Sequence, residues 1–227
     1  VGRRQQDHVN VEFSKDYDEL KAMSSIPKTK ILSVISSSKT MSEGHRKRLD
    51  FAKWLKIHFG DQVDLFGRDL NEIEDKWDAL ADYQYHVALE NSAVNDYWTE
   101  KLSDAFLAAC HPIYYGCPNI NRYFDPASLT LIDLDHPEKA MAVIESCIEQ
   151  KRYESSEQKI WEAREKVLDT HNVFALIADY IEKDKQSAGD RPCLCTAAGV
   201  VLGAARDPAG VQAAPDRAAG AGRAARH

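Results

Sequence analysis

The stretch LENSAVNDYWTEKLSDAFLAACHPIYYG, residues 89–116, decides the fold. It joins an apolar run (Tyr83–Leu89) through a polar corner, Glu90-Asn91-Ser92, to a helix predicted to open at Tyr97 and to run to Ala109; a second apolar run, Pro112–Tyr115, follows. Apolar residues at i, i+3, i+4 and i+7 give this helix one buried face. A strand that ends in hydrogen-bonding groups and leads into a helix N-terminus is typical of α/β proteins that bind phosphorylated ligands.

The same alternation extends outward from this stretch. Continuous apolar runs predict strands at 31–35, 63–66 and 129–132, and amphipathic patterns predict helices at about 44–59, 137–150 and 156–180, with 71–81 partly helical. Strands alternating with helices predict an α/β fold, a Rossmann-like doubly wound parallel sheet with C-terminal helices. The polar segments SSSKT (36–40), FGR (66–68) and ENS (90–92) follow three strands, so we expect them to meet at one edge of the sheet.

Three segments are expected along the chain. Residues 1–28 form a lead-in with one short helix near 17–23, and residues 29–188 form the Rossmann-like domain with its C-terminal helices. Residues 189–227 are rich in Ala, Gly and Arg and lack periodic bulky residues. Such a composition buries too little apolar surface to offset ordering entropy, so we expect this tail to be disordered.

Composition narrows the class of protein. The formal net charge of −7 argues against a general nucleic-acid binder, which needs a basic face. No apolar run approaches the roughly 20 residues of a membrane span, and the N-terminal residues lack the apolar core of a signal peptide. The five cysteines are scattered, which favours free thiols in a reducing compartment. The expected location is the bacterial cytoplasm, with peripheral association at the inner membrane surface left open.

Two readings of the Glu100-Lys101 pair stay open from the residues alone. A cation in the first turn of a helix is disfavoured by the helix dipole unless an anion lies beside it, which points to a phosphate. Glu100 lies about 100° around the helix from Lys101 and is expected to face elsewhere, where a carboxylate suits sugar hydroxyls. In the alternative reading, Glu100 and Lys101 are solvated surface residues. Asn95 or Asp96 is then a simple N-cap, and Tyr97 is a residue that packs against its neighbours.

The spacing ENS-x4-Y-x-TEK, followed by A-x6-PIYYG and PNI-x2-YF-x-P-x-S, resembles glycosyltransferase family 10, the α-1,3/1,4-fucosyltransferases. The resemblance covers about residues 31–153 and, more loosely, the helical region to 183. It implies the C-terminal lobe of a GT-B type enzyme, with GDP-fucose as donor substrate and no permanently bound cofactor.

The resemblance also implies residue roles. Glu100 would bind the ribose hydroxyls, Lys101 the diphosphate, and Asn91 and Tyr97 would line the donor pocket. The other donor-binding candidates in the motif are Glu90, Ser92 and Thr99. An arginine on the helix after the first strand is expected at the diphosphate; Arg48, in Arg48-Leu-Asp-Phe51, fits best, and Arg46 is the alternative.

The implied reaction is inverting transfer of fucose to a glycan acceptor, such as lipopolysaccharide or another oligosaccharide. The general base would belong to an amino-terminal lobe, for which the residues before 31 are too few; the chain starts at Val1 without Met, so we expect a fragment. Two alternatives remain: a non-catalytic nucleotide-binding module, and a transferase that uses another nucleotide sugar. The oligomeric state is left open.

Other motifs are assigned structural roles. Asp133-Leu-Asp135 resembles a DxD metal motif, but two carboxylates are too few for a hard cation, so no metal site is predicted. His86 and His111 lack ligand spacing and are predicted to be core or edge histidines. Three tryptophans are predicted to pack in the core or half-buried: Trp54, Trp77 and Trp161.

Overall fold

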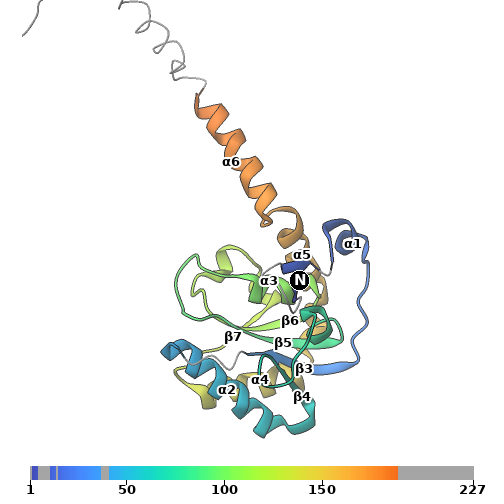
Figure 1. Cartoon of the computed structure of the whole chain (residues 1–227), viewed down its shortest axis with the longest axis vertical. Coiled ribbons are helices and arrows are strands. Elements are labelled where there is room, and N and C mark those ends of the chain that lie inside the picture. The colour runs from blue at the N-terminus through green and yellow to red at the C-terminus, as the bar shows by residue number, and fades with distance from the viewer. Residues whose placement is uncertain (1, 5–10, 14, 37–40, 189–227) are drawn as a thin grey trace, which may run out of the picture. The chain divides into compact units, whose positions relative to one another are not determined.

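Five parallel strands form the central sheet of the computed structural model, which describes residues 2–4, 11–13, 15–36 and 41–188 (Figure 1). They are β3 (Lys30–Ile35), β4 (Val63–Phe66), β5 (Tyr83–Leu89), β6 (His111–Tyr115) and β7 (Thr130–Leu131). Their order is β4-β3-β5-β6-β7, and every neighbouring pair is parallel. This order is that of an open doubly wound sheet, so the predicted α/β class is confirmed.

Helices cover both faces of the sheet because the central strands are apolar on both sides. One hydrophobic cluster joins α2 (Glu43–Phe59) and α4 (Pro137–Glu149) to Tyr85, Val87 and Leu89 of β5. The other joins α3 (Glu100–Leu107) and α5 (Arg152–Asp169) to the opposite side of the sheet, including Ala88. Successive residues of β5 thus point into different halves of the core.

The crossover from β4 to β5 contains a short 3-10 segment, η2 (Lys76–Ala79), where partial helix was predicted. Leu80 packs against Ala105 and Ala108 of α3 and against Ile35 at the end of β3. A short segment covers less of a sheet face than a full helix does. A cavity lined in part by Lys76 and Leu80 opens beside it.

Two helix boundaries differ from the predictions. The helix predicted from Tyr97 begins at Glu100, because the Thr99 hydroxyl accepts from the Lys101 backbone N–H and caps it. The single helix predicted over 156–180 is two helices, α5 and α6 (Val173–Ala188). The His171 ring packs against Trp98, Tyr123 and Phe124 at the break, and the Asn172 side chain accepts from Ala175 N to start α6.

The lead-in contains α1 (Tyr17–Ala22), close to its predicted position, and two strands that were not predicted, β1 (Gly2–Arg4) and β2 (Val11–Phe13). Tyr17 and Lys21 both bond to the Asp169 carboxylate at the end of α5. The buried Arg164 donates to the carbonyls of Leu107 and Leu20. These bonds fix α1 to the helical layer that also holds α3.

The chain divides into one compact unit of residues 1–177 and a second that begins at Ala178. The predicted tail, 189–227, lies outside the described residues, and the predicted boundaries stay predictions. Within the described ranges, no helix combines the length and hydropathy needed to cross a bilayer. Trp54, Trp77 and Trp161 are half-buried, as predicted, and the described cysteines are buried free thiols: Cys110, Cys117 and Cys147.

Candidate functional site

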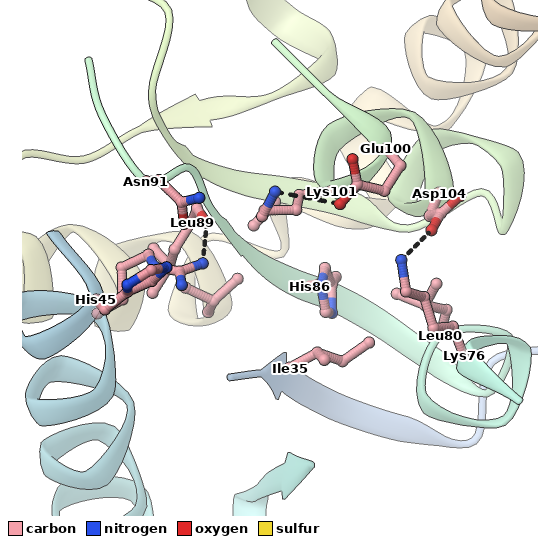
Figure 2. A pocket seen from close by; sticks show the side chains of 13 residues that line it. Ile35, His45, Lys76, Leu80, His86, Leu89, Asn91, Glu100, Lys101 and Asp104 are labelled. Atoms are coloured by element: carbon pink, nitrogen blue, oxygen red, sulfur yellow. Dashed lines mark hydrogen bonds and ion pairs between the residues drawn. The ribbon is translucent and has the colours of Figure 1, made fainter. Parts of the chain in front are cut away.

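A cavity of about 260 Å³ lies at the carboxyl ends of β3 and β5. The chain leaves these neighbouring strands towards opposite faces of the sheet, through α2 and α3. This is the switch point at which open α/β sheets bind ligands. Figure 2 shows His45 and Asn91 at one end of the cavity, Lys76, Leu80 and Asp104 at the other, and His86 between them.

The N-terminus of α2 reaches the polar corner at close range. Ser42 caps the helix by accepting from His45 N, and an added Cβ on Gly44 would lie 2.1 Å from the Asn91 carbonyl oxygen. A helix N-terminus that approaches a strand end this closely presents its dipole to the cavity. Because any side chain at position 44 would clash with Asn91, glycine is required there for this approach.

Arg48 supplies a buried cation to the cavity. Its residue is 7% exposed, and its Nη1 donates to the Leu89 carbonyl at 3.1 Å. Its Nε is buried and has no hydrogen-bond partner among the described residues. Burial lowers the pKa of the guanidinium, and the charges of Glu90 and Glu100 partly oppose this. An unsatisfied donor of this kind is costly unless a ligand completes it.

The sequence left Arg48 and Arg46 as alternatives for this position. Arg48 lines the cavity, whereas Arg46 is exposed and lies outside its lining. The difference follows from helix geometry, because residues two apart point to different sides of α2. Lys47, between them, pairs with Asp135 at 2.7 Å and with Glu43.

Glu90 lies beneath the cavity and does not line it. Its carboxylate is fully buried and accepts from the Thr99 backbone N–H at 2.8 Å and from the Thr99 hydroxyl at 2.9 Å. These bonds hold the end of β5 to the start of α3. The two side chains bond to one another, and neither lines the cavity. The predicted contacts of Glu90 and Thr99 with the donor stay predictions.

Lys101 bridges three oxygen groups. Its Nζ lies 3.0 Å from the Thr99 hydroxyl, 3.2 Å from Glu100 and 3.3 Å from Glu90. The expectation that Glu100 and Lys101 face different directions is wrong, because the long lysine side chain folds back over the helix start. The carboxylate of Glu90 also supplies the anion that a cation at a helix N-terminus requires.

Glu100 stands at the open side of the cavity, with its side chain 56% exposed. Partial burial by itself would raise the pKa of this carboxyl. The charge and hydrogen bond of Lys101 and the charge of Lys76 outweigh that effect, so the pKa lies below its ordinary value. Glu100 is therefore a carboxylate at neutral pH and can accept hydrogen bonds from ligand hydroxyls.

The remaining predicted donor residues lie in the loop between β5 and α3. Asn91 lines the cavity, whereas Ser92 and Tyr97 are exposed and lie outside its lining. The loop is fixed through Asp96, which has a φ of 59° and whose carboxylate accepts from Asn119 at 2.9 Å and from the Tyr123 hydroxyl at 2.7 Å. The roles of Ser92 and Tyr97 stay predictions.

Sequence reasoning missed four polar side chains that line the cavity. His86 was predicted to be a core histidine; it is buried and bonded to Ser33 at 2.8 Å, yet it also lines the cavity. His45, Lys76 and Asp104 were not singled out. Asp104 carried a usable signal, since it lies one helical turn after Glu100 on the same face.

The prediction that His111 is a core histidine is supported. His111 is a core residue, bonded to the Ser156 and Thr130 hydroxyls. Asp135 pairs with Lys47. Among the residues that the structure describes, no three His, Cys, Asp or Glu side chains group closely enough to hold a metal ion.

Comparisons with known proteins agree on one family. Residues 26–181 match the model of "Glycosyltransferase family 10 (fucosyltransferase) C-term". The chain is 33% identical over 91 residues to GDP-fucose protein O-fucosyltransferase 3 of Danio rerio, covering 40% of this chain and 19% of that protein. It is 34% identical over 56 residues to alpha-(1,3)-fucosyltransferase FucT of Helicobacter pylori, covering 25% of this chain and 12% of that protein.

A solved structure of an alpha1,3-fucosyltransferase with GDP aligns at 21% identity and a TM-score of 0.48, over 65% of this chain and 49% of that chain. The matched part of the chain spans about half the length of that solved chain and less than a fifth of the length of either curated relative.

Proposed function

Because the chain belongs to glycosyltransferase family 10, the fucosyltransferases, and matches the family's C-terminal domain, we propose that its cavity binds GDP-fucose. The observation that carries the proposal is the Arg48 guanidinium, which is buried at the cavity with Nε unbonded among the described residues. A diphosphate there would accept from the guanidinium and lie at the α2 N-terminus.

The neighbouring side chains suit the rest of the nucleotide. In this proposal Glu100 accepts from the ribose hydroxyls, and Lys101 contacts the diphosphate. Lys101 forms ion pairs with Glu90 and Glu100. Donor binding therefore exchanges the Glu100–Lys101 ion pair for a phosphate–Lys101 pair and makes the Glu100 carboxylate available to the ribose.

The proposed reaction is an inverting displacement. The acceptor oxygen forms a bond to the anomeric carbon of fucose while the bond from that carbon to the β-phosphate oxygen breaks, leaving GDP with the electron pair. Arg48 and Lys101 stabilise the charge that develops on the diphosphate, which is the kind of preorganised electrostatic effect that contributes most in such sites. The acceptor proton passes to a general base, which we assign to an amino-terminal lobe of a GT-B arrangement.

The acceptor in this proposal is a glycan. Lipopolysaccharide or another oligosaccharide as acceptor, the bacterial cytoplasm as location, and peripheral association with the inner membrane stay predictions. They can be tested once donor binding has been measured.

Calorimetric titration with GDP and GDP-fucose tests the donor site. We expect both ligands to bind, and Arg48→Ala and Lys101→Ala each to weaken binding by about 10- to 100-fold, the equivalent of one or two charge-assisted hydrogen bonds. Arg46→Ala, an exposed neighbour on α2, is the matched control and should bind like the parent chain. A folded sample that binds neither ligand would contradict the proposal.

Two further measurements separate the alternatives. Transfer of fucose to an N-acetyllactosamine acceptor by this chain alone would exclude a non-catalytic module. Displacement of bound ligand by UDP-sugars at concentrations where GDP-fucose has no effect would indicate a different donor.

A further inference from the structure

The cavity continues beyond the residues assigned to ribose and diphosphate. Its far end, which we call the inner end, is formed by Lys76, Leu80 and Asp104, and Ile35 and His86 lie beside them towards the middle of the cavity (Figure 2). None of these side chains has a part in the proposed function. The cavity thus has a charged region with no assigned ligand group.

An ion pair forms the polar part of the inner end. Lys76 Nζ donates to Asp104 Oδ2 at 3.1 Å, and the side chains are 35% and 10% exposed. Asp104 precedes Ala105, which belongs to a small apolar cluster with Leu80 and Ala108. A buried carboxylate is costly unless charged or hydrogen-bonding partners offset the cost, and Lys76 is one such partner.

The position of this pair matches the geometry of a nucleoside. Asp104 follows Glu100 by four residues, so the two carboxylates share one face of α3, separated by about 6 Å along the helix axis. If Glu100 accepts from the ribose, the base projects along α3 towards the inner end. Ile35, Leu80 and Val87 provide apolar surface for a planar ring there.

The chemistry of the pair fits one base. Guanine presents its O6 acceptor beside the N1–H and N2 amino donors on a single edge. A carboxylate accepts from both donors and an adjacent ammonium donates to O6, and such charge-assisted bonds are the strong ones. Adenine places an acceptor where guanine has N1–H, so it would face the carboxylate unfavourably.

We propose that Asp104, positioned by Lys76, binds the guanine edge of the donor nucleotide and makes the site selective for guanine. This rests on the proposed function, since the placement of the base assumes ribose at Glu100. His86 lies beneath as a neutral group, because burial lowers its pKa to about 3, so it adds no charge that would compete with the pair.

Titration of the whole chain with GDP, IDP, ADP and XDP tests the inference. IDP lacks the N2 amino group, and XDP carries an oxygen in its place. The parent chain should bind GDP about tenfold or more tightly than IDP, the equivalent of one hydrogen bond to a charged group, and more tightly still than ADP. Asp104→Asn should lose that preference and gain affinity for XDP, because an amide can donate to the new oxygen.

A gain of XDP binding cannot arise from misfolding, which makes it the decisive readout. Asp78→Asn, an exposed aspartate on η2, is the matched control and should leave all four affinities unchanged. Should Asp104→Asn fail to fold, Lys76→Met provides the second test, with an expected loss of preference for GDP over ADP.

The outcomes separate the two proposals. A parent chain that binds none of the nucleotides contradicts the proposed function. A parent chain that binds GDP while Asp104→Asn or Lys76→Met keeps the parent's order of affinities contradicts only the assignment of Asp104.

Discussion

At the scale of single residues, the site is a set of balanced charges. The charges of Glu90 and Glu100 act on Arg48, and both carboxylates form ion pairs with Lys101. Lys76 forms an ion pair with Asp104. Glu90, which is fully buried, does not line the cavity and instead holds Thr99 and Lys101 in place. Its role is therefore to position the cation that we assign to the diphosphate.

Substitution of Glu90 separates positioning from donor contact. Glu90→Gln should lower the free energy of unfolding by about 1–3 kcal/mol, because a fully buried acceptor of the Thr99 hydrogen bonds is replaced by a neutral amide. GDP affinity of the folded protein should not fall, since the site loses a negative charge. Urea unfolding and calorimetry measure both quantities. A loss of GDP affinity as large as that of Lys101→Ala would instead favour the predicted direct contact of Glu90.

At the scale of elements, the site depends on how closely two of them meet. The first turn of α2 approaches the corner after β5 so closely that only glycine fits at position 44. Opposite it, α3 begins at Glu100, because Thr99 caps the helix and the Glu90 carboxylate holds the Thr99 hydroxyl in place. Both helix N-termini are thereby held at the same edge of the sheet.

Two glycine substitutions on α2 test this approach. Gly44→Ala should force the helix away from Asn91, costing about 1–3 kcal/mol of stability and weakening GDP binding. Gly60→Ala, at the other end of α2, meets no atom within 4 Å but has a φ of 57°, so it should cost stability without changing GDP affinity. Equal GDP affinities for the two variants would refute a role of the close approach.

At the scale of the whole molecule, the buried side chains of His86 and His111 make the stability of the fold depend on pH. Burial lowers the pKa of His111 to about 4 and that of His86 to about 3, both below the ordinary value. Between these values and about 6.5 the unfolded chain binds more protons than the folded protein does. Stability should therefore be highest above this window and fall as the pH drops through it.

Urea unfolding at about pH 7 and about pH 5 measures this effect, with a slope of up to about 1.4 kcal/mol per pH unit for each histidine. His111→Gln should reduce the loss of stability between the two conditions, since one of the two protonatable groups is removed. His136→Gln, at an exposed position, should keep the loss of the parent chain. An unchanged pH dependence in His111→Gln would contradict the assignment.

Much of the fold could be predicted from the sequence, because burial on both faces leaves a continuous apolar run in each strand. Val63–Phe66 and Tyr83–Leu89 were predicted at their observed bounds, and the alternation with helices gave the doubly wound class. Boundaries that depend on distant contacts were not predictable: the break between α5 and α6 requires the His171 ring to pack against residues about 50 to 70 positions earlier.

The sequence by itself predicted the sheet edge at which the cavity lies and the family, because both follow from local spacing and from position at a strand end. It also named Asn91, Glu100 and Lys101, and Arg48 with Arg46 as the alternative; of these five, all but Arg46 line the cavity. Only the tertiary structure decided which predicted groups face the cavity. Glu90 is turned away by its bonds to Thr99, and Lys76 meets Asp104 across 28 residues of chain. The physical reason is that side-chain direction and burial arise from packing between elements, which no single segment specifies.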